Sequence, residues 1–238
     1  MIRLIRADLR RLRRKPALYI LTAFVLFRIL FRPDADTAAD QVASLRNSMN
    51  IVGMWVPSIP VFLGVYGDEI KSGALATVIG RGTSRRKFVV AKLLDVFILF
   101  LFVYALELFA AVLCCSASEL GVTDRQYLFL AVSALYSLIR VMGYFAIASL
   151  VVFETWSAAG GMVVLIINIL LLGIFLEGAQ NRLHLPIYDL SLDGLLDASY
   201  AAFSAGGLGW QILPALVIYI GFVVWLTVRR FNKKEIDL

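Results

Sequence analysis

The sequence has very few residues that could hold a metal ion or build a catalytic centre. It contains one histidine, His184, and two cysteines, Cys114 and Cys115, which are adjacent in the chain. This spacing matches neither a zinc site nor a disulfide framework. One histidine cannot supply the paired ligands of a membrane metalloprotease, and His184 lies outside the predicted spans, where a bilayer serine protease could not use it. We therefore expect no catalytic residue and no metal in this chain.

Charged residues are also scarce, at 17% of the sequence against 61% hydrophobic residues, and the mean hydropathy is +0.84. A water-soluble domain could not carry this composition without aggregating. The apolar runs are continuous and do not alternate at period 2, which favours helices over a membrane barrel. We predict an all-α integral membrane protein with a single transmembrane domain over residues 1–238. The net charge of +6 arises beside apolar runs, where basic residues contact anionic lipid, so we expect no nucleic-acid partner.

Six apolar runs are candidates for crossing a hydrocarbon core of about 30 Å. The first has only 15 residues and would reach about 22 Å at 1.5 Å per residue, so it needs a longer helix or a thinner bilayer. The runs cover residues 17–31, 49–66, 93–116, 127–152, 157–176 and 210–228.

The distribution of lysine and arginine sets the expected orientation. Residues 1–15 hold seven of them, residues 67–92 hold six and the C-terminal tail holds four, whereas the loops on the other side hold four in total. Because cytoplasmic loops are enriched in basic residues, we predict that both termini and the segment 67–92 are cytoplasmic.

The first 15 residues have the pattern of an amphipathic helix. Its apolar and basic positions recur at helical spacing: Ile2, Ile5, Leu9 and Leu12 on one side, and Arg3, Arg6, Arg10 and Arg13 on the other. Such a helix lies on a membrane surface. Pro16 fits the first turn of a following helix, where its missing N–H costs nothing. We predict an elbow helix over residues 1–15 and a retained anchor after it, not a cleaved signal peptide.

The polar segment 67–92, GDEIKSGALATVIGRGTSRRKFVVAK, lies between two apolar runs. Its first half has apolar residues on one helical face, at Ile70, Ala74, Leu75, Val78 and Ile79. Asp68 and Glu69 come at the start of this pattern, where carboxylates favour the helix dipole. The glycines at 80 and 82 end it, and Thr83 or Ser84 can cap a new helix. We predict a short amphipathic helix at the cytoplasmic face, a sharp turn and re-entry into the membrane.

This segment resembles the signature of the permease subunits of ABC-2 type exporters. That signature is a Glu, a Gly-Thr one turn later, an apolar helix, and Ser-Arg shortly before a Lys that starts the third span. The matching residues are Glu69, Gly73, Ser84, Arg85 and Lys92. Ala74 stands in place of the family's threonine, and a Gly-Arg-Gly turn replaces its usual proline. The resemblance implies six spans in a bacterial inner membrane and a cytoplasmic coupling helix, to which Asp68, Leu75 and Arg86 also belong.

The chain contains no Gly-x-x-x-x-Gly-Lys-Ser/Thr pattern, so it cannot cradle a nucleotide by that route. The resemblance implies that separate ABC ATPase subunits bind ATP and Mg²⁺, and that a second permease chain, identical or paralogous, completes the transporter. It further implies export of a hydrophobic or amphipathic substrate, such as an antimicrobial peptide or a drug. The other interpretation of 67–92 is a charged connector with an incidental amphipathic face.

Two charged residues lie near the middle of predicted spans, Glu107 in the third and Arg140 in the fourth. An unpaired charge at this depth costs at least about 2.5–3.5 kcal/mol. Their depths agree to within about one helical turn of 5.4 Å, so we predict that they pair, either as a clamp between helices or as part of a substrate path. Asp95, near the cytoplasmic surface, is expected to contact a nearby basic residue.

Other polar or helix-breaking residues within the spans are candidates for lining a path. Pro57 and Pro60 should loosen the second span, and Asn168 is an amide in the middle of the fifth that can bond across an interface. Residues 177–209 form a long, partly apolar outer loop. By resemblance it contains short helices that close the outer mouth, and the alternative is an interfacial helix with no gating role.

Two further function classes remain open. An ion-coupled secondary transporter could use Glu107, Arg140 and Asp95 as a relay, although no internal repeat is evident and the cytoplasmic motif would have no role. A purely structural membrane scaffold is the other.

Overall fold

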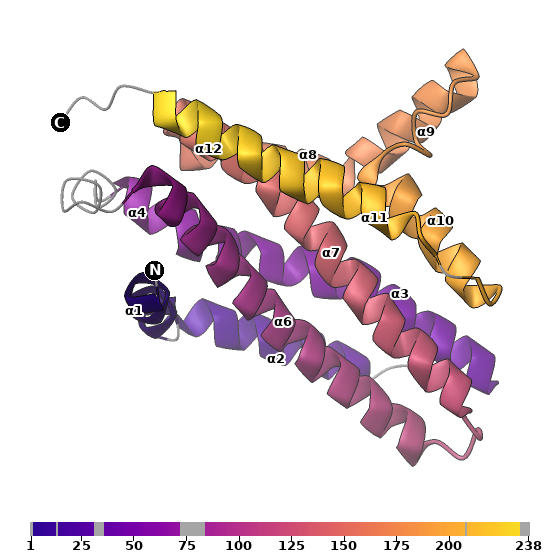
Figure 1. The fold of residues 1–238 in the computed structure, drawn as a ribbon. Helices are drawn as coiled ribbons and strands as arrows, with labels where there is room; N and C mark the ends of the chain where they lie inside the picture. Colours follow the sequence, from indigo (N-terminus) through magenta and orange to yellow (C-terminus); the bar gives the residue numbers. More distant parts are fainter. Residues whose placement is uncertain (1, 13, 31–35, 72–83, 208, 234–238) are drawn as a thin grey trace.

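The computed structural model of the chain describes residues 2–12, 14–30, 36–71, 84–207 and 209–233, and within them it is helical with no β-strand. The long helices pack lengthwise into a bundle (Figure 1). In chain order the helices are α1 Ile2–Leu12, α2 Pro16–Leu30, α3 Ala38–Phe62, η1 Leu63–Gly67, α4 Asp68–Lys71, α6 Arg85–Ala117, α7 Asp124–Thr155, α8 Ala158–Leu170, α9 Leu172–Leu183, α10 Leu192–Ser204, α11 Ile212–Pro214, η2 Ala215–Phe222 and α12 Val223–Lys233. The all-α class is confirmed.

Five helical stretches within the described residues are long and apolar enough to cross a membrane: Ala38–Gly67, Arg85–Ala117, Asp124–Thr155, Ala158–Leu183 and Ile212–Lys233. These agree with the predicted second to sixth spans. The helix of the predicted first span, α2, packs against α3 and α6, but its 15 residues reach only about 22 Å. A sixth span therefore stays a prediction.

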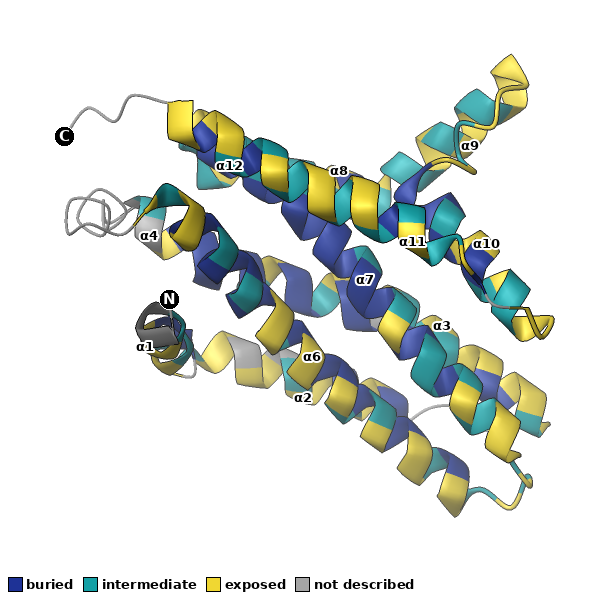
Figure 2. Ribbon diagram, viewed as in Figure 1, coloured by how far each residue is buried: buried dark blue, intermediate teal, exposed yellow. Residues whose placement is uncertain are grey.

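Helix α7 lies at the centre of the bundle. Of the 18 residues in its most apolar part, 67% are buried, compared with 17% in the corresponding part of α8 and α9 and 11% in that of η2 and α12. Rings pack around its inner half: Phe145 lies 5.4 Å from Phe100 and 6.0 Å from Phe62, centroid to centroid. Buried residues follow the inward sides of α3, α6 and α7 (Figure 2). Large apolar side chains on the outer surface, such as Phe102 and Phe109, suit contact with lipid chains.

Local sequence signals account for several helix ends. Ser84 caps α6, because its side chain accepts a hydrogen bond from the backbone N–H of Lys87, as predicted. Thr123 and Gln126 form a reciprocal capping box at the start of α7. Pro16 is the first residue of α2, also as predicted.

The prolines of the second span do not end its helix. Pro57 and Pro60 both lie inside α3, and the Ser58 hydroxyl donates to the Met54 carbonyl at 2.5 Å. The helix widens directly after them into the π-helical turn η1. The predicted loosening is thus found on the C-terminal side of the prolines, where backbone bonds are re-registered.

The chain leaves the bundle after α8 and then rejoins it. The helix breaks at Leu171, and α9 diverges from the other helices (Figure 1); none of its residues is buried. Helix α10 then packs lengthwise on α7: Leu192 contacts Gly143, and the Phe203 ring lies 5.9 Å from that of Phe129. The predicted loop 177–209 therefore contains a helix, α10, that lies along α7 from Phe129 to Gly143.

Candidate functional site

The predicted coupling segment 67–92 is described only at its two ends. Gly73 and Leu75 lie outside the described residues, and so does the side chain of Glu69, whose backbone belongs to α4. The ends of the segment are α4 and the start of α6, which lie at the same end of the bundle as α1 and the last turn of α12 (Figure 1). Ion pairs and hydrogen bonds hold each of these two ends against neighbouring parts of the chain.

At the first end, Asp68 forms an ion pair with Lys15, the residue before α2. One turn earlier in the chain, the Arg11 guanidinium donates to the Gly64 carbonyl at 3.3 Å. Half of the Asp68 side chain is exposed, and a pair of this kind contributes at most about 1 kcal/mol. These contacts orient α4 relative to α1 without strongly stabilising it.

At the second end, a buried ion pair joins α6 to α1. Lys92 is 0% exposed, and its Nζ donates to Oδ2 of Asp8 at 2.6 Å. Asp95, one turn along α6, has a carboxylate oxygen 3.9 Å from the same nitrogen, so its predicted contact with a basic residue is confirmed. Because Lys92 is buried, its contacts in this conformation lie within the chain.

The arginines at the start of α6 have different surroundings. Arg85 Nη1 donates to the carbonyl oxygens of Phe231 and Asn232 at 2.7 and 3.2 Å, which fixes the last turn of α12 against α6. Arg86 is exposed and makes no hydrogen bond or ion pair with a described residue. The segment 67–92 is thus connected at its two ends to α1 and α12.

In the middle of the bundle, the predicted pair of Glu107 and Arg140 is wrong. Arg140 pairs with α10: its Nε lies 3.0 Å from Asp193 Oδ1, and its Nη2 lies 2.6 Å from Asp197 Oδ1. The two acidic residues are one helical turn apart and face the same guanidinium. Similar depth in neighbouring helices does not make Glu107 and Arg140 a pair, because Glu107 faces α3 and Arg140 faces α10.

Two tyrosines complete this cluster of α7 and α10. The Tyr144 hydroxyl donates to Asp193 Oδ1 at 2.5 Å, and the Tyr188 hydroxyl donates to Asp197 Oδ2 at 2.9 Å. Burial and the bond to Asp197 raise the pKa of Tyr188, so it remains a donor at neutral pH. Burial also raises the pKa of Asp193, an effect that Arg140 and Tyr144 oppose. These ion pairs and hydrogen bonds form a clamp that holds the N-terminal half of α10 on α7.

Glu107 has a different environment. It is 1% exposed, and neither carboxylate oxygen has a hydrogen-bond partner among the described residues. Its carboxylate packs against Gly53 of α3, where no larger residue would fit without displacing it. The hydroxyl of Tyr104, one turn back on α6, is likewise buried without a described partner. Glu107 and Tyr104 are thus two buried polar groups, one turn apart on α6, that have no hydrogen-bond partner among the described residues.

Of the remaining predicted path residues, Asn168 is buried in α8, and its side-chain nitrogen has no described hydrogen-bond partner. Pro57 is buried and Pro60 is partly buried in α3. On α3, one turn before Gly53, the side chain of Asn50 accepts a hydrogen bond from the Ser137 hydroxyl of α7. The structure therefore brings Glu107 next to α3 but does not join it to Asn168.

Sequence reasoning missed Asp8 and the pair Asp193 and Asp197. Each has a recognisable signal: Asp8 is the one acidic residue in a strongly basic amphipathic segment, and the other two recur at a spacing of four in an apolar stretch. Within the described ranges, no group of three or more His, Cys, Asp or Glu residues is placed to hold a metal ion.

Comparison of the chain with protein-family models, with curated proteins and with solved structures finds no match. Function must therefore be argued from the sites themselves.

Proposed function

We propose that this chain is the membrane-spanning permease subunit of an ATP-driven exporter of the ABC-2 type. In this proposal it works in the bacterial inner membrane with separate ABC ATPase subunits and a second permease chain. The substrate is hydrophobic or amphipathic, such as an antimicrobial peptide or a drug. The chain itself carries no catalytic residue, and ATP and Mg²⁺ bind to the partner.

The observation that supports this most directly is the way both ends of the segment 67–92 are attached. At the first end, Asp68 pairs with Lys15. At the second end, Lys92 joins α6 to α1 through Asp8, and Arg85 joins α6 to α12. A displacement of the segment would therefore move α1, α6 and α12 together. A charged connector with no mechanical role would need no such attachments, because exposed loops are ordinarily free to vary.

In the proposed mechanism, closure of the ATPase dimer on ATP moves the helix that begins at Asp68 and Glu69. The motion passes through α4 and η1 into α3, and through Arg85 and Lys92 into α6. The π-helical turn η1 follows Pro57 and Pro60, where the helix has already departed from regular bonding. It is the place where α3 would bend as the bundle changes from inward to outward access.

Copurification tests the proposal. The tagged full-length chain is purified from its native host, and copurified ABC-type ATPase and ATP hydrolysis are measured. Glu69→Ala should lower the affinity about tenfold if one contact worth about 1.4 kcal/mol is lost. Lys233→Ala is the control, because Lys233 is exposed at the same end of the bundle but lies outside the segment 67–92 and should change neither quantity.

Two results would overturn the proposal. One is a purified chain that transports substrate in proteoliposomes with no ATPase present. The other is equal recovery of ATPase with Glu69→Ala and with the control Lys233→Ala. Arg85→Ala is less informative here, because Arg85 also holds α12 through the carbonyls of Phe231 and Asn232.

The alternative is an ion-coupled secondary transporter, and one observation favours it. The carboxylate of Glu107 is buried without a described hydrogen-bond partner, and a cation or a proton would satisfy it. Arg140 is engaged by Asp193 and Asp197, and Asp95 lies beside Lys92, so a relay through all three is not favoured. Substrate flux in proteoliposomes of the chain alone, driven by a pH or sodium gradient and lost in Glu107→Gln, would identify this class.

A further inference from the structure

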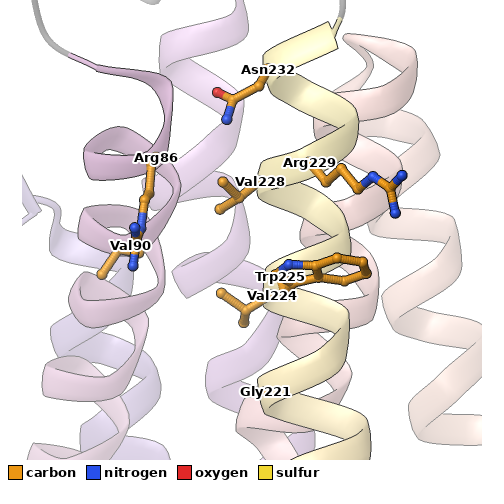
Figure 3. Close-up of a pocket in the computed structure, with 8 residues that line it drawn as sticks. All are labelled: Arg86, Val90, Gly221, Val224, Trp225, Val228, Arg229 and Asn232. Atoms are coloured by element: carbon orange, nitrogen blue, oxygen red, sulfur yellow. The ribbon is translucent and has the colours of Figure 1, made fainter.

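An open groove lies between α6 and α12, at the end of the bundle that carries α1. It encloses about 520 Å³. Figure 3 shows Val224, Val228 and Asn232 pointing from α12 toward α6, with Arg86 and Val90 on the facing helix. Trp225 and Arg229 lie at its outer rim. The groove thus has an apolar floor and polar, basic groups at one end.

The floor continues deeper into the bundle as a second, almost entirely apolar hollow of about 290 Å³. The two spaces share Val90 and Val224, so they form one elongated groove. Its deeper part is lined by Leu93, Leu94, Phe97, Met142, Ala146 and Ile220. A ligand that fills the groove must be charged or polar at one end and have an extended hydrocarbon part.

The basic residues of the groove have no acidic partner in the described part of the chain. Arg85 and Arg230, their neighbours in sequence, bind the Phe231 carbonyl at 2.7 Å and Glu154 at 3.7 Å. By contrast, Arg86 and Arg229 form no ion pair with any described residue, and no acidic residue lines the groove. Two cations are therefore presented without a counter-charge, which favours an anionic ligand.

Trp225 indicates the depth of the polar end. Its ring is 52% exposed and lies 5.2 Å from the guanidinium carbon of Arg229. Tryptophan with arginine is the pairing found where the hydrocarbon core meets the headgroups. Below it the groove is apolar, and above it lie Arg86 and Asn232.

We propose that this groove binds an anionic phospholipid of the leaflet on the α1 side. The headgroup phosphate is held by Arg86 and Asn232, Arg229 adds positive charge on the side of α12 that faces away from α6, and one acyl chain lies along Val90 and Val224. The apolar continuation selects a lipid over a soluble phosphate, because a phosphate alone would leave that surface exposed. A second copy of the chain is disfavoured, since it would bring the same basic end against this one. The site goes beyond the proposed export function and does not depend on it.

Native mass spectrometry of the purified full-length chain tests the site, with dioleoyl phosphatidylglycerol and dioleoyl phosphatidylcholine as probes. The wild type should bind phosphatidylglycerol more tightly than phosphatidylcholine. Arg86→Gln with Arg229→Gln should reduce this preference by about fivefold for each arginine. The matched control is Lys87→Gln with Arg230→Gln, which removes the same charge from the same end but outside the groove, and it should keep the preference.

A variant of the floor separates the possible occupants. Val224→Trp fills the apolar part and leaves both arginines, so it should weaken phosphatidylglycerol binding while glycerol 3-phosphate competes in neither protein. Competition by glycerol 3-phosphate, equal binding of the two lipids, or equal loss in the control double variant would each overturn the proposal. So would a dimer that Val224→Trp dissociates with no change in lipid preference, since the groove would then be an interface between copies.

Discussion

The carboxylate of Glu107 on α6 packs against the α-carbon of Gly53 on α3, and a methyl group at position 53 would collide with both of its oxygens. Both residues are buried. Gly53 has ordinary helical torsions, so it is needed for close helix approach and not for backbone freedom. The relationship makes α3 and α6 interdependent at this depth.

Gly53→Ala is therefore expected to destabilise the protein by about 1–3 kcal/mol, the usual cost of overpacking a core. The same cost should persist when Glu107→Gln is combined with it, because glutamine has the same shape. It should largely vanish with Glu107→Ala, which removes the colliding atoms. Thermal unfolding of the purified variants measures these differences, and strictly additive effects of Gly53→Ala and Glu107→Ala would contradict the contact.

The clamp between α7 and α10 gives a second prediction. Arg140→Met leaves Asp193 without its counter-charge, and breaking a buried pair in this way costs about 3–5 kcal/mol. We expect α10 to detach, with faster backbone hydrogen exchange over Leu192–Ser204. Asp197→Asn is the matched comparison, because the Asp197 side chain is 53% exposed and its loss should cost about 1 kcal/mol or less.

Exchange over α10 that is unchanged in Arg140→Met would show that the apolar contacts of Leu192 and Phe203 hold the helix without the ion pairs. Equal acceleration in Arg140→Met and Asp197→Asn would contradict the distinction between the buried and the exposed carboxylate.

The helices of this fold were predictable because their signals are local. Continuous apolar runs predicted the long helices, and Ser84 and Pro16 predicted where two of them begin. Such signals depend only on backbone hydrogen bonding and side-chain burial over a few turns. Whether α2 crosses the membrane could not be predicted in this way, because its 15 residues are close to the shortest length that could span.

The partners of the buried charges were not predictable in this way. The depth of Glu107 and Arg140 follows from counting residues, but the direction in which each side chain points depends on how the helices are rotated. The true partner of Arg140 is more than 50 residues away, in a segment that sequence reasoning assigned to an outer loop. Likewise, Lys92 finds Asp8 at a separation of 84 residues. Long-range pairing of this kind is set by tertiary packing.

The buried pair of Asp8 and Lys92 gives a third prediction. Lys92→Met should destabilise the protein by about 3–5 kcal/mol, because the buried carboxylates of Asp8 and Asp95 both lose their shared cation. Asp8→Asn should cost less, because Asp95 still lies 3.9 Å from Lys92 Nζ. The double variant should cost less than the two single losses added together, because the direct pair is lost in both single variants, but it should not reach the wild type because Asp95 also loses Lys92. A double-mutant cycle on apparent melting temperature measures the coupling, and additive losses would mean that the two side chains act independently.

Arginine substitution distinguishes charge from geometry at the same pair. Lys92→Arg keeps the charge but has a planar head too large for a site that is 0% exposed. It should therefore be destabilising, whereas a surface lysine such as Lys87 should accept arginine with little effect on melting.

Orientation in the membrane gives a fourth prediction, with cysteine labelling as the measurement. In a background with Cys114 and Cys115 replaced by alanine, Lys87→Cys should react with a membrane-impermeant maleimide only after the cells are permeabilised. Glu119→Cys, at the other end of α6, should react in intact cells. Both positions are exposed, so a difference between them reports sidedness and not burial. Labelling of Lys87→Cys in intact cells would place the segment 67–92 outside and end the proposed coupling role.

The same measurement decides whether α2 crosses the bilayer. Arg14 and Asp36 are exposed residues on either side of it. If α2 spans, Asp36→Cys is labelled in intact cells and Arg14→Cys is not, and the bilayer must thin or the helix must extend to match about 22 Å. If both are labelled, α2 lies on one side and the chain crosses five times. The basic residues of α1 would then face outward, against the positive-inside rule, so we expect the first result.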